Sequence, residues 1–328
     1  MSIWNFIAEK LAAKIPVMLL WVLESEGSSP GRQGFAMAVS KNGDFYGTIG
    51  GGIMEHKLVE KAKVALHKGI KLISLTRQYH DKQHATDRSG MICSGSQLNA
   101  FFPLDFNDLP LIQNIITAEN NSNKIVKLQP TGISLATSNK EESSTVFFEY
   151  ISDEEWLYIT PIKNEPVVHI FGGGHVGLAL SQQLSFLNFY IKIYDNRPAL
   201  HTMMANHWAH EKHLINYDAL EEEIKIKEED YAVIVTVGYK TDKTIFQQLL
   251  HHKLRYLGMM GSEAKIKTLL TEMEMEGLSP SLWKDCFLPI GVLIHSRTAE
   301  EIAVSIAAEI ILNKNKNLPT GRSNFQSN

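Results

Sequence analysis

The chain has 328 residues, of which 44% are hydrophobic and 21% are charged, and its formal net charge is −4. This composition is typical of a soluble globular protein with room for about two domains, and its small negative charge gives no reason to expect a nucleic-acid partner. Two cysteines, Cys93 and Cys286, lie far apart, which argues against a disulfide framework and a cysteine-based zinc site and favours a reducing compartment.

The N-terminal stretch, MSIWNFIAEKLAAKIP, has Glu9 in its middle and no basic beginning. It predicts a short amphipathic helix with Trp4, Ile7 and Leu11 on one side, rather than a signal peptide. The next residues, 16–24, predict a buried strand, and their apolar run is too short to span a bilayer. We therefore expect a soluble protein of the cytoplasm.

The first half of the chain predicts an α+β domain over residues 1–164. Two β-like runs, 35–40 and 45–49, flank an Asn-Gly step that is a strong hairpin signal. Glycines at 50–52 open a helical pattern that continues to about residue 68. A short helix is expected within residues 105–124 and a polar loop over 79–96. Other β-like runs cover residues 71–78, 97–103, 126–128, 132–136, 145–150 and 156–159.

The second half alternates strands and helices and predicts a Rossmann-like parallel sheet over residues 165–312. Thr298 and Glu301 have capping-box spacing at the start of the last helix. The polar residues 313–328 predict a disordered tail. The apolar runs that predict strands cover residues 167–171, 190–195, 231–237, 256–260 and 291–295.

A glycine-rich motif follows the first of these strands. Gly172, Gly174 and Gly177 have G-x-G-x-x-G spacing, and a helical pattern comes next. The first glycine allows a tight turn, the second lets a pyrophosphate approach the backbone, and the third lets helix and strand pack closely. The motif predicts a nucleotide-binding Rossmann fold; the alternative is a Rossmann core that has lost its dinucleotide or binds another phosphate ligand.

Three polar residues accompany this motif. Asp195 ends the second strand and would accept a hydrogen bond from a ribose 2′-OH, which favours an NAD-like ligand. Arg197 points the other way, because a guanidinium pairs with phosphate. His175 either reaches a ligand or faces solvent. After residues 231–237, Thr241 and Asp242 are either near a ligand or cap a helix.

A second glycine-rich loop lies in the first half. Gly50, Gly51 and Gly52 would expose consecutive N–H groups to a docking ligand. Glu55, in the first helical turn, is a candidate general base, although a charge that complements the helix dipole is the interpretation that physics favours.

Two other segments of small residues are candidate sites. The loop with Gly27, Ser28, Ser29 and Arg32 suits a phosphate or a pterin-like anion, or is an ordinary turn. Cys93, flanked by small residues, is either a thiolate ligand or nucleophile, or a small buried residue.

No histidine pattern predicts a metal site. His80 and His84 stand four residues apart beside aspartates, where a polar loop is the favoured interpretation over metal ligation. His207, His210 and His213 have three-residue spacing without a carboxylate pattern and are expected on the surface.

Taken together, the motifs resemble the XdhC/CoxI family, the xanthine dehydrogenase accessory factors. The matching segments, spread over about residues 17–312, are GSSPGRQGFAMAV, GTIGGGIME, the Cys93 block, HIFGGGHVG, IYDNRP, LRYLGMMGSEAK and RTAEEIAVSIAAEI. An N-terminal G-G-G-x-x-E domain before a Rossmann domain with YLGMMGS is an unusual combination, so the resemblance is specific.

The resemblance implies a molybdenum-cofactor chaperone rather than a hydroxylase. Such a protein binds molybdopterin-type cofactor during sulfuration and passes it to a xanthine-dehydrogenase-class enzyme. It implies cofactor-binding roles for the loops at residues 27–32 and 50–52 with Glu55 and Cys93, and a nucleotide site at residues 172–195. A homodimer, a cysteine desulfurase as a further partner and membrane association only through partners are also expected.

Three positions depart from the family pattern. Ser94 replaces the first glycine of a Cys-Gly-Gly step, while Val237 and Tyr239 replace an Arg and a His. These changes put a phosphate or catalytic role at residues 236–239 in doubt. The alternative function is an NAD(P)-dependent oxidoreductase, although no Tyr-x-x-x-Lys or His–Asp pair for hydride transfer follows the Rossmann strands.

Overall fold

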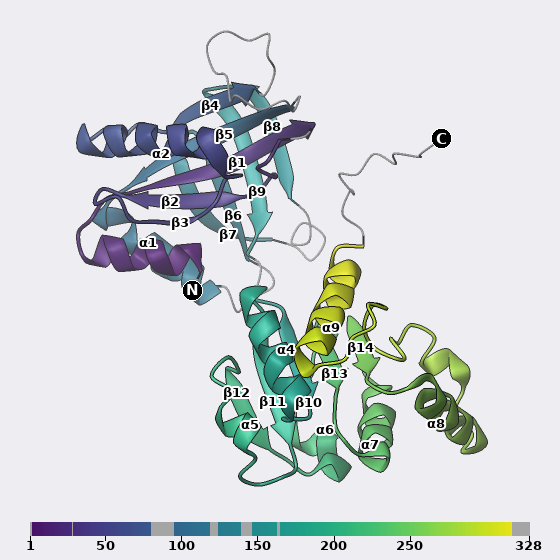
Figure 1. The fold of residues 1–328 in the computed structure, drawn as a ribbon. Coiled ribbons are helices and arrows are strands. Elements are labelled where there is room, and N and C mark those ends of the chain that lie inside the picture. Colours follow the sequence, from purple (N-terminus) through teal and green to yellow (C-terminus); the bar gives the residue numbers. More distant parts are fainter. Residues whose placement is uncertain are drawn as a thin grey trace. The chain divides into compact units, whose positions relative to one another are not determined.

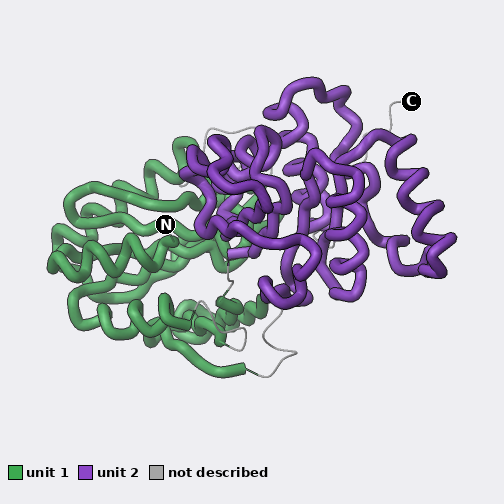
Figure 2. The backbone as a smooth tube through the Cα atoms, turned by 90° about the horizontal axis from the view of Figure 1, so that it is seen from below, with its two compact units in different colours: residues 1–164 green, residues 165–328 purple. Residues whose placement is uncertain are grey.

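The computed structural model describes residues 2–27, 29–79, 95–118, 124–138, 146–162 and 165–316. The chain divides into two compact units, Met1–Asn164 (unit 1) and Glu165–Asn328 (unit 2), which Figure 2 shows in green and purple. Each unit has its own sheets and its own apolar core.

Unit 1 is built on two antiparallel sheets (Figure 1). Among the described residues, the first has the order β3-β2-β1-β5-β4 and the second β7-β6-β9-β8. The strands are β1 (Val17–Gly27), β2 (Ala36–Ser40), β3 (Phe45–Gly47), β4 (Ser74–Tyr79), β5 (Gly95–Leu104), β6 (Lys124–Gln129), β7 (Gly132–Thr137), β8 (Phe147–Ser152) and β9 (Glu155–Pro161). The helices are α1 (Ile3–Ala12), α2 (Gly52–His67), η1 (Phe106–Asp108) and α3 (Leu109–Ala118).

Strand β1 is apolar at successive positions because both faces of its sheet are covered. Leu19 and Trp21 enter one core with α1 and α3, whereas Leu20 and Val22 enter another beneath α2. The predicted helix at the N-terminus is confirmed: its predicted apolar side is buried in the first core. The predicted hairpin is also confirmed, with Met37 opposite Gly47.

Unit 2 is a Rossmann-like domain. Its sheet is parallel, in the order β12-β11-β10-β13-β14, with helices on both faces (Figure 1). The strands are β10 (Val167–Phe171), β11 (Tyr190–Asp195), β12 (Glu211–Leu214), β13 (Tyr231–Ile234) and β14 (Tyr256–Met259). The helices are α4 (His175–Phe186), α5 (His201–Met204), η2 (Tyr217–Ala219), α6 (Leu220–Glu223), α7 (Tyr239–Leu249), α8 (Glu263–Met275), η3 (Pro280–Leu282) and α9 (Ala299–Lys314).

The strand order places a topological switch point between β10 and β13. The chain moves from β10 to β11 on one side and returns to β13 on the other, and ligands of open α/β sheets bind where the order reverses. Helices α4 and α9 pack on one face, while α7 and α8 pack on the other. The carboxyl ends of β10, β13 and β14 therefore form one edge, which holds the glycine-rich motif.

Two predicted strands of unit 2 differ from the structure. Strand β13 ends at Ile234, and Val237 is 85% exposed, because the chain turns away at the edge of the sheet. The predicted strand over 291–295 is wrong. At Gly291 (φ +99°) the chain turns onto α9 instead, where Val292 N–H donates to the Ser305 carbonyl and Ser305 Oγ donates to the Val292 carbonyl.

The predicted capping box of α9 is confirmed and gives a stability prediction. Thr298 Oγ1 accepts from Glu301 N–H at 3.2 Å, and Glu301 Oε2 accepts from Thr298 N–H at 3.1 Å. We expect Thr298→Ala to lower the free energy of unfolding by about 1 kcal/mol, measured by urea titration. Thr268→Ala is the control, because that hydroxyl only bonds back to the Ala264 carbonyl in α8. Equal stability of the two variants would contradict a capping role.

Candidate functional site

In unit 1 the structure brings two of the sequence-predicted loops together. Gly31 lies against Ile49 and Gly50: a Cβ on Gly31 would stand 2.2 Å from the Ile49 carbonyl oxygen, and one on Gly50 would stand 2.4 Å from Gly31 N. Real side chains essentially never show such contacts, so both positions require glycine. We call this meeting of residues 29–32 and 49–52, at the N-terminus of α2, the loop junction.

Glu55 holds the loop junction in shape. Its Oε2 accepts from Thr48 Oγ1 at 2.6 Å, from Ile49 N–H at 2.9 Å and from Gly51 N–H at 3.0 Å. Gly50 N–H donates to Thr48 Oγ1 at 3.1 Å. The loop thus uses the N–H groups of Gly50 and Gly51 internally.

Other donors of the loop junction are directed to no acceptor in the part of the chain that the structure describes. These are the N–H groups of Gly52 and Ile53, at the positive end of the α2 dipole. Arg32 is exposed and makes no ion pair with a described residue. A Cβ at Gly51 or Gly52 would meet nothing within 4 Å. The junction therefore offers donors and open space to an anion.

Sequence analysis missed a buried polar network beneath the loop junction. Ser29 Oγ donates to Gln97 Oε1 at 2.9 Å, and Gln97 Nε2 donates to the Ile49 carbonyl at 3.0 Å and to Asn99 Oδ1 at 2.7 Å. All three side chains are buried. Gln97 and Asn99 lie two apart in β5, on the face covered by α2, so polar residues at strand period were the signal that could have revealed them.

Ser28 and Cys93 lie outside the described residues. Gly27, with φ +62°, pairs with Gly95 in the register of β1 and β5. Cys93 is two residues before Gly95 in the sequence.

In unit 2 the glycine-rich motif forms a tight loop at the switch point. Gly172 has φ +119°, and a Cβ there would stand 2.6 Å from the Val235 carbonyl oxygen. A Cβ on Gly177 would stand 2.0 Å from the Gly172 carbonyl oxygen, so α4 packs directly on the end of β10. The N–H groups of Gly174 and His175 have no acceptor among the described residues, and the His175 side chain is exposed.

Asp195 is buried and bonded to this loop. It accepts from Gly173 N–H at 2.7 Å, and Arg197 binds it with Nε at 2.9 Å and Nη2 at 2.8 Å. Burial disfavours the charged carboxylate, but the bonds from Arg197 and Gly173 outweigh it and hold the pKa of Asp195 below its usual value. Arg197 remains 43% exposed.

A buried ion pair lies at the same edge of the sheet. Asp242 is fully buried; it accepts from Thr236 Oγ1 after β13 and from Lys265 Nζ of α8. Lys265 also donates to the Met260 carbonyl at 3.3 Å. Desolvation raises the pKa of Asp242 despite these bonds. Since the N-cap of α7 is Gly238, Asp242 is not a cap, and its side chain ties α7 to α8.

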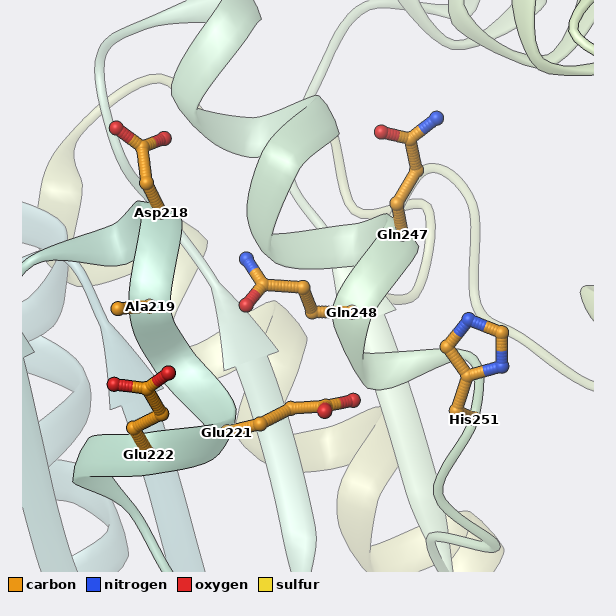
Figure 3. Close-up of a pocket in the computed structure, with 7 residues that line it drawn as sticks. All are labelled: Asp218, Ala219, Glu221, Glu222, Gln247, Gln248 and His251. Atoms are coloured by element: carbon orange, nitrogen blue, oxygen red, sulfur yellow. The ribbon is translucent and has the colours of Figure 1, made fainter.

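A hollow of about 360 Å³ lies elsewhere in unit 2 (Figure 3). Figure 3 shows Gln248 of α7 pointing toward the turn before α6, where its amide bonds to the Tyr217 carbonyl and Leu220 N–H. The hollow contains no residue predicted as a site, and its three carboxylates would repel phosphate. Its lining residues are Asp218, Ala219, Glu221, Glu222, Gln247, Gln248 and His251.

Membrane spans and metal clusters are both missing from the described ranges. None of the helices there is long and apolar enough to cross a membrane. The same ranges contain no group of three or more His, Cys, Asp or Glu side chains arranged to hold a metal ion.

Two family comparisons match this chain. Residues 168–310 match the XdhC Rossmann domain, and residues 11–79 match the XdhC and CoxI family. The chain belongs to the XdhC and CoxI family. The matched ranges contain the glycine-rich motif of unit 2 and the loop junction of unit 1.

Relatives agree with this family. The chain is 22% identical over 324 residues to YqeB, an uncharacterized protein of Escherichia coli (strain K12), covering 98% of this chain and 48% of the relative, so it spans about half of that protein's length. It is 24% identical over 314 residues to a probable xanthine dehydrogenase subunit of Bacillus subtilis (strain 168), covering 90% and 92%. A solved structure described as a xanthine dehydrogenase from Bacillus halodurans has the same fold, with a TM-score of 0.79, 22% identity and 99% coverage of both chains. The names of the family and of these relatives indicate a xanthine dehydrogenase accessory factor.

Proposed function

We propose that this protein binds molybdenum cofactor in unit 1 and supports its sulfuration and its insertion into a xanthine-dehydrogenase-class enzyme. The observation that carries the proposal is the loop junction, where two family motifs far apart in the sequence meet at Gly31 and Gly50. The client enzyme is the main partner, and a cysteine desulfurase and a second copy of this chain are the others.

The residues of the loop junction fit a molybdopterin-type group. Its phosphate would be held by the N–H groups of Gly52 and Ile53 and by Arg32, because a helix N-terminus and a guanidinium both favour phosphate. The open space beside Gly51 would let the ligand approach the backbone. When bound, the cofactor supplies the molybdenum and its terminal sulfur ligand, and the chain binds and shields it.

Glu55 is a positioning residue in this proposal. Three donors converge on its Oε2 atom and fix the loop junction around it, which supports a structural role rather than general-base catalysis. Gly27 and Ser29 act in the same way, since the first ends β1 in a left-handed conformation and the second bonds to Gln97.

We assign any sulfur chemistry of the chain to Cys93. The other cysteine, Cys286, is half-buried, and burial raises the pKa of its thiol to about 11, so it stays protonated at neutral pH. The thiolate, not the thiol, is the nucleophile and ligand. Unchanged activation of the client enzyme by Cys93→Ser would end this assignment. The free thiol also supports action in a reducing cytoplasm.

For unit 2 we propose a nucleotide site at Gly172, Gly174 and Gly177. The tight loop, the N–H groups of Gly174 and His175 and the switch point support it. Whether the nucleotide serves hydride transfer, as in an NAD(P)-dependent oxidoreductase, is tested by following NADPH absorbance with candidate substrates.

The chaperone proposal predicts that Gly51→Ala abolishes cofactor binding without unfolding the chain. Gly51 has φ +76° and an open Cβ direction, so the methyl group costs about 1 kcal/mol of backbone strain and occupies the ligand's approach. The measurement is molybdenum and oxidised-pterin content of protein purified from cells that make the cofactor.

Gly69→Ala is the matched control, because Gly69 ends the same helix with φ +66° and nothing within 4 Å of its Cβ position. Near-stoichiometric pterin in the wild type and in Gly69→Ala, with a loss of about tenfold or more in Gly51→Ala, is the expected result. No pterin in the wild type, or equal pterin in both variants, would reject the site.

A further inference from the structure

The carboxylate of Asp195 has no acceptor position left for a ribose. A carboxylate offers about four lone-pair positions. Oδ1 accepts from the N–H and the Nε of Arg197, each at 2.9 Å. Oδ2 accepts from Gly173 N–H at 2.7 Å and from Arg197 Nη2 at 2.8 Å. A 2′,3′-diol must donate to a free acceptor, so the side chain that usually recognises NAD is fully engaged here.

Arg197 offers donors at the same place. A guanidinium has five N–H groups, and the fork to Asp195 uses those at Nε and one at Nη2. The side chain is 43% exposed, and its Nη2 atom lies 4.0 Å from the Cβ position of Gly174, in the loop that precedes α4. Asp195 fixes the guanidinium plane, so the remaining donors are directed rather than mobile.

We propose that unit 2 selects a 2′-phosphorylated dinucleotide of the NADP type over NAD, with Arg197 as the specificity-determining residue and Asp195 as the residue that positions it. The inference rests on the nucleotide role proposed for unit 2. Arginine forms bidentate hydrogen bonds with phosphate, and a phosphate on the ribose needs donors, which is what this corner presents. The sequence pattern of glycines followed by Asp195 pointed to NAD; the filled carboxylate reverses that preference.

The test is equilibrium binding of NADPH and NADH to the full-length chain, followed by nicotinamide fluorescence, with 2′,5′-ADP as a small competitor. Wild-type protein should bind NADPH at least about tenfold more tightly than NADH, the factor expected of a charge-assisted bond. Arg197→Met should lose that factor for NADPH and leave NADH unchanged. Arg197→Lys keeps the charge without the fork and should give an intermediate preference, which also decides the question if the Met variant does not fold.

Arg255→Met is the control, since Arg255 precedes β14 at the opposite edge of the sheet and bonds to the Lys314 carbonyl. It should bind both dinucleotides as the wild type does. Equal or tighter binding of NADH by the wild type, or NADPH affinity unchanged in both Arg197 variants, overturns the inference and leaves the nucleotide site standing. Absence of binding by both dinucleotides and by 2′,5′-ADP overturns the nucleotide site itself, and the inference with it.

Discussion

Lys265→Met is expected to lower the free energy of unfolding of unit 2 by about 3–5 kcal/mol at neutral pH, the cost of leaving one partner of a buried ion pair alone. Asp242 is fully buried, and Lys265 is the cation that bonds to it. Without that cation, the Thr236 hydroxyl is the side-chain donor that the carboxylate keeps among the described residues. Urea titration of the full chain measures the loss.

The same variant should recover stability in acid. Burial raises the pKa of Asp242 in the folded chain, so the folded state binds this proton more tightly than the unfolded state does. Stability from this group is fully present below the unfolded pKa, about 3.9, and is lost as pH rises through the folded pKa. Removing Lys265, whose bond lowers that pKa, extends the loss to higher pH. The difference from wild type should therefore be larger at pH 7 than at pH 5.

Lys243→Met is the matched control for Lys265→Met. Lys243 joins the same two helices, bonding from α7 to Glu272 and Glu276 of α8, but those carboxylates are 42% and 50% exposed. Exposed pairs contribute about 0–1 kcal/mol, so this variant should stay close to the wild type. If the two variants lose equal stability, or the loss in Lys265→Met does not depend on pH, the ion pair does not have the role assigned to it.

Gly177→Ala should destabilise unit 2 by about 1–3 kcal/mol and abolish nucleotide binding. Alanine in a helix interior normally stabilises it by about 1 kcal/mol relative to glycine. Here the added methyl group would stand 2.0 Å from the Gly172 carbonyl oxygen and 3.3 Å from Ile193 Cδ1. Helix α4 must move away from β10, and the loop between them must open.

Urea unfolding and NADPH binding measure the two effects of Gly177→Ala. Phe186→Ala is the control in the same helix, because that side chain is 73% exposed and its loss should change stability by less than about 0.5 kcal/mol. A Gly177→Ala protein as stable as the wild type, with nucleotide affinity retained, would show that close packing of α4 on β10 is not required.

The fold was largely predictable because its signals are local. Apolar periodicity, the Asn42-Gly43 step and the Thr298–Glu301 spacing each depend on neighbours within a few residues, and the structure confirms the elements they predict. The strand expected over 291–295 is wrong because an apolar run does not reveal that the chain turns onto α9. Local pattern predicts an element, but not the partner of its backbone.

The candidate sites were less predictable, because they depend on contacts between distant residues. Gln97 bonds to Ser29, and Lys265 bonds to Asp242; these pairs are 68 and 23 residues apart. Asp195 was identified from its spacing after the glycines, but nothing local shows that Arg197 fills its acceptors. Motif spacing located the loops, whereas the roles of their side chains required the tertiary structure.

The separation of the cores bears on how the chain is made. The four core clusters each lie within one unit: the two of unit 1 end at Ile162 and Phe101, and the two of unit 2 begin at Val168 and Phe171. A ribosome therefore adds every residue of the antiparallel cores before it adds the first parallel strand. Because domains generally fold as units during synthesis, the early sheets can close before the parallel sheet is complete, and strand exchange between the two architectures is avoided by timing.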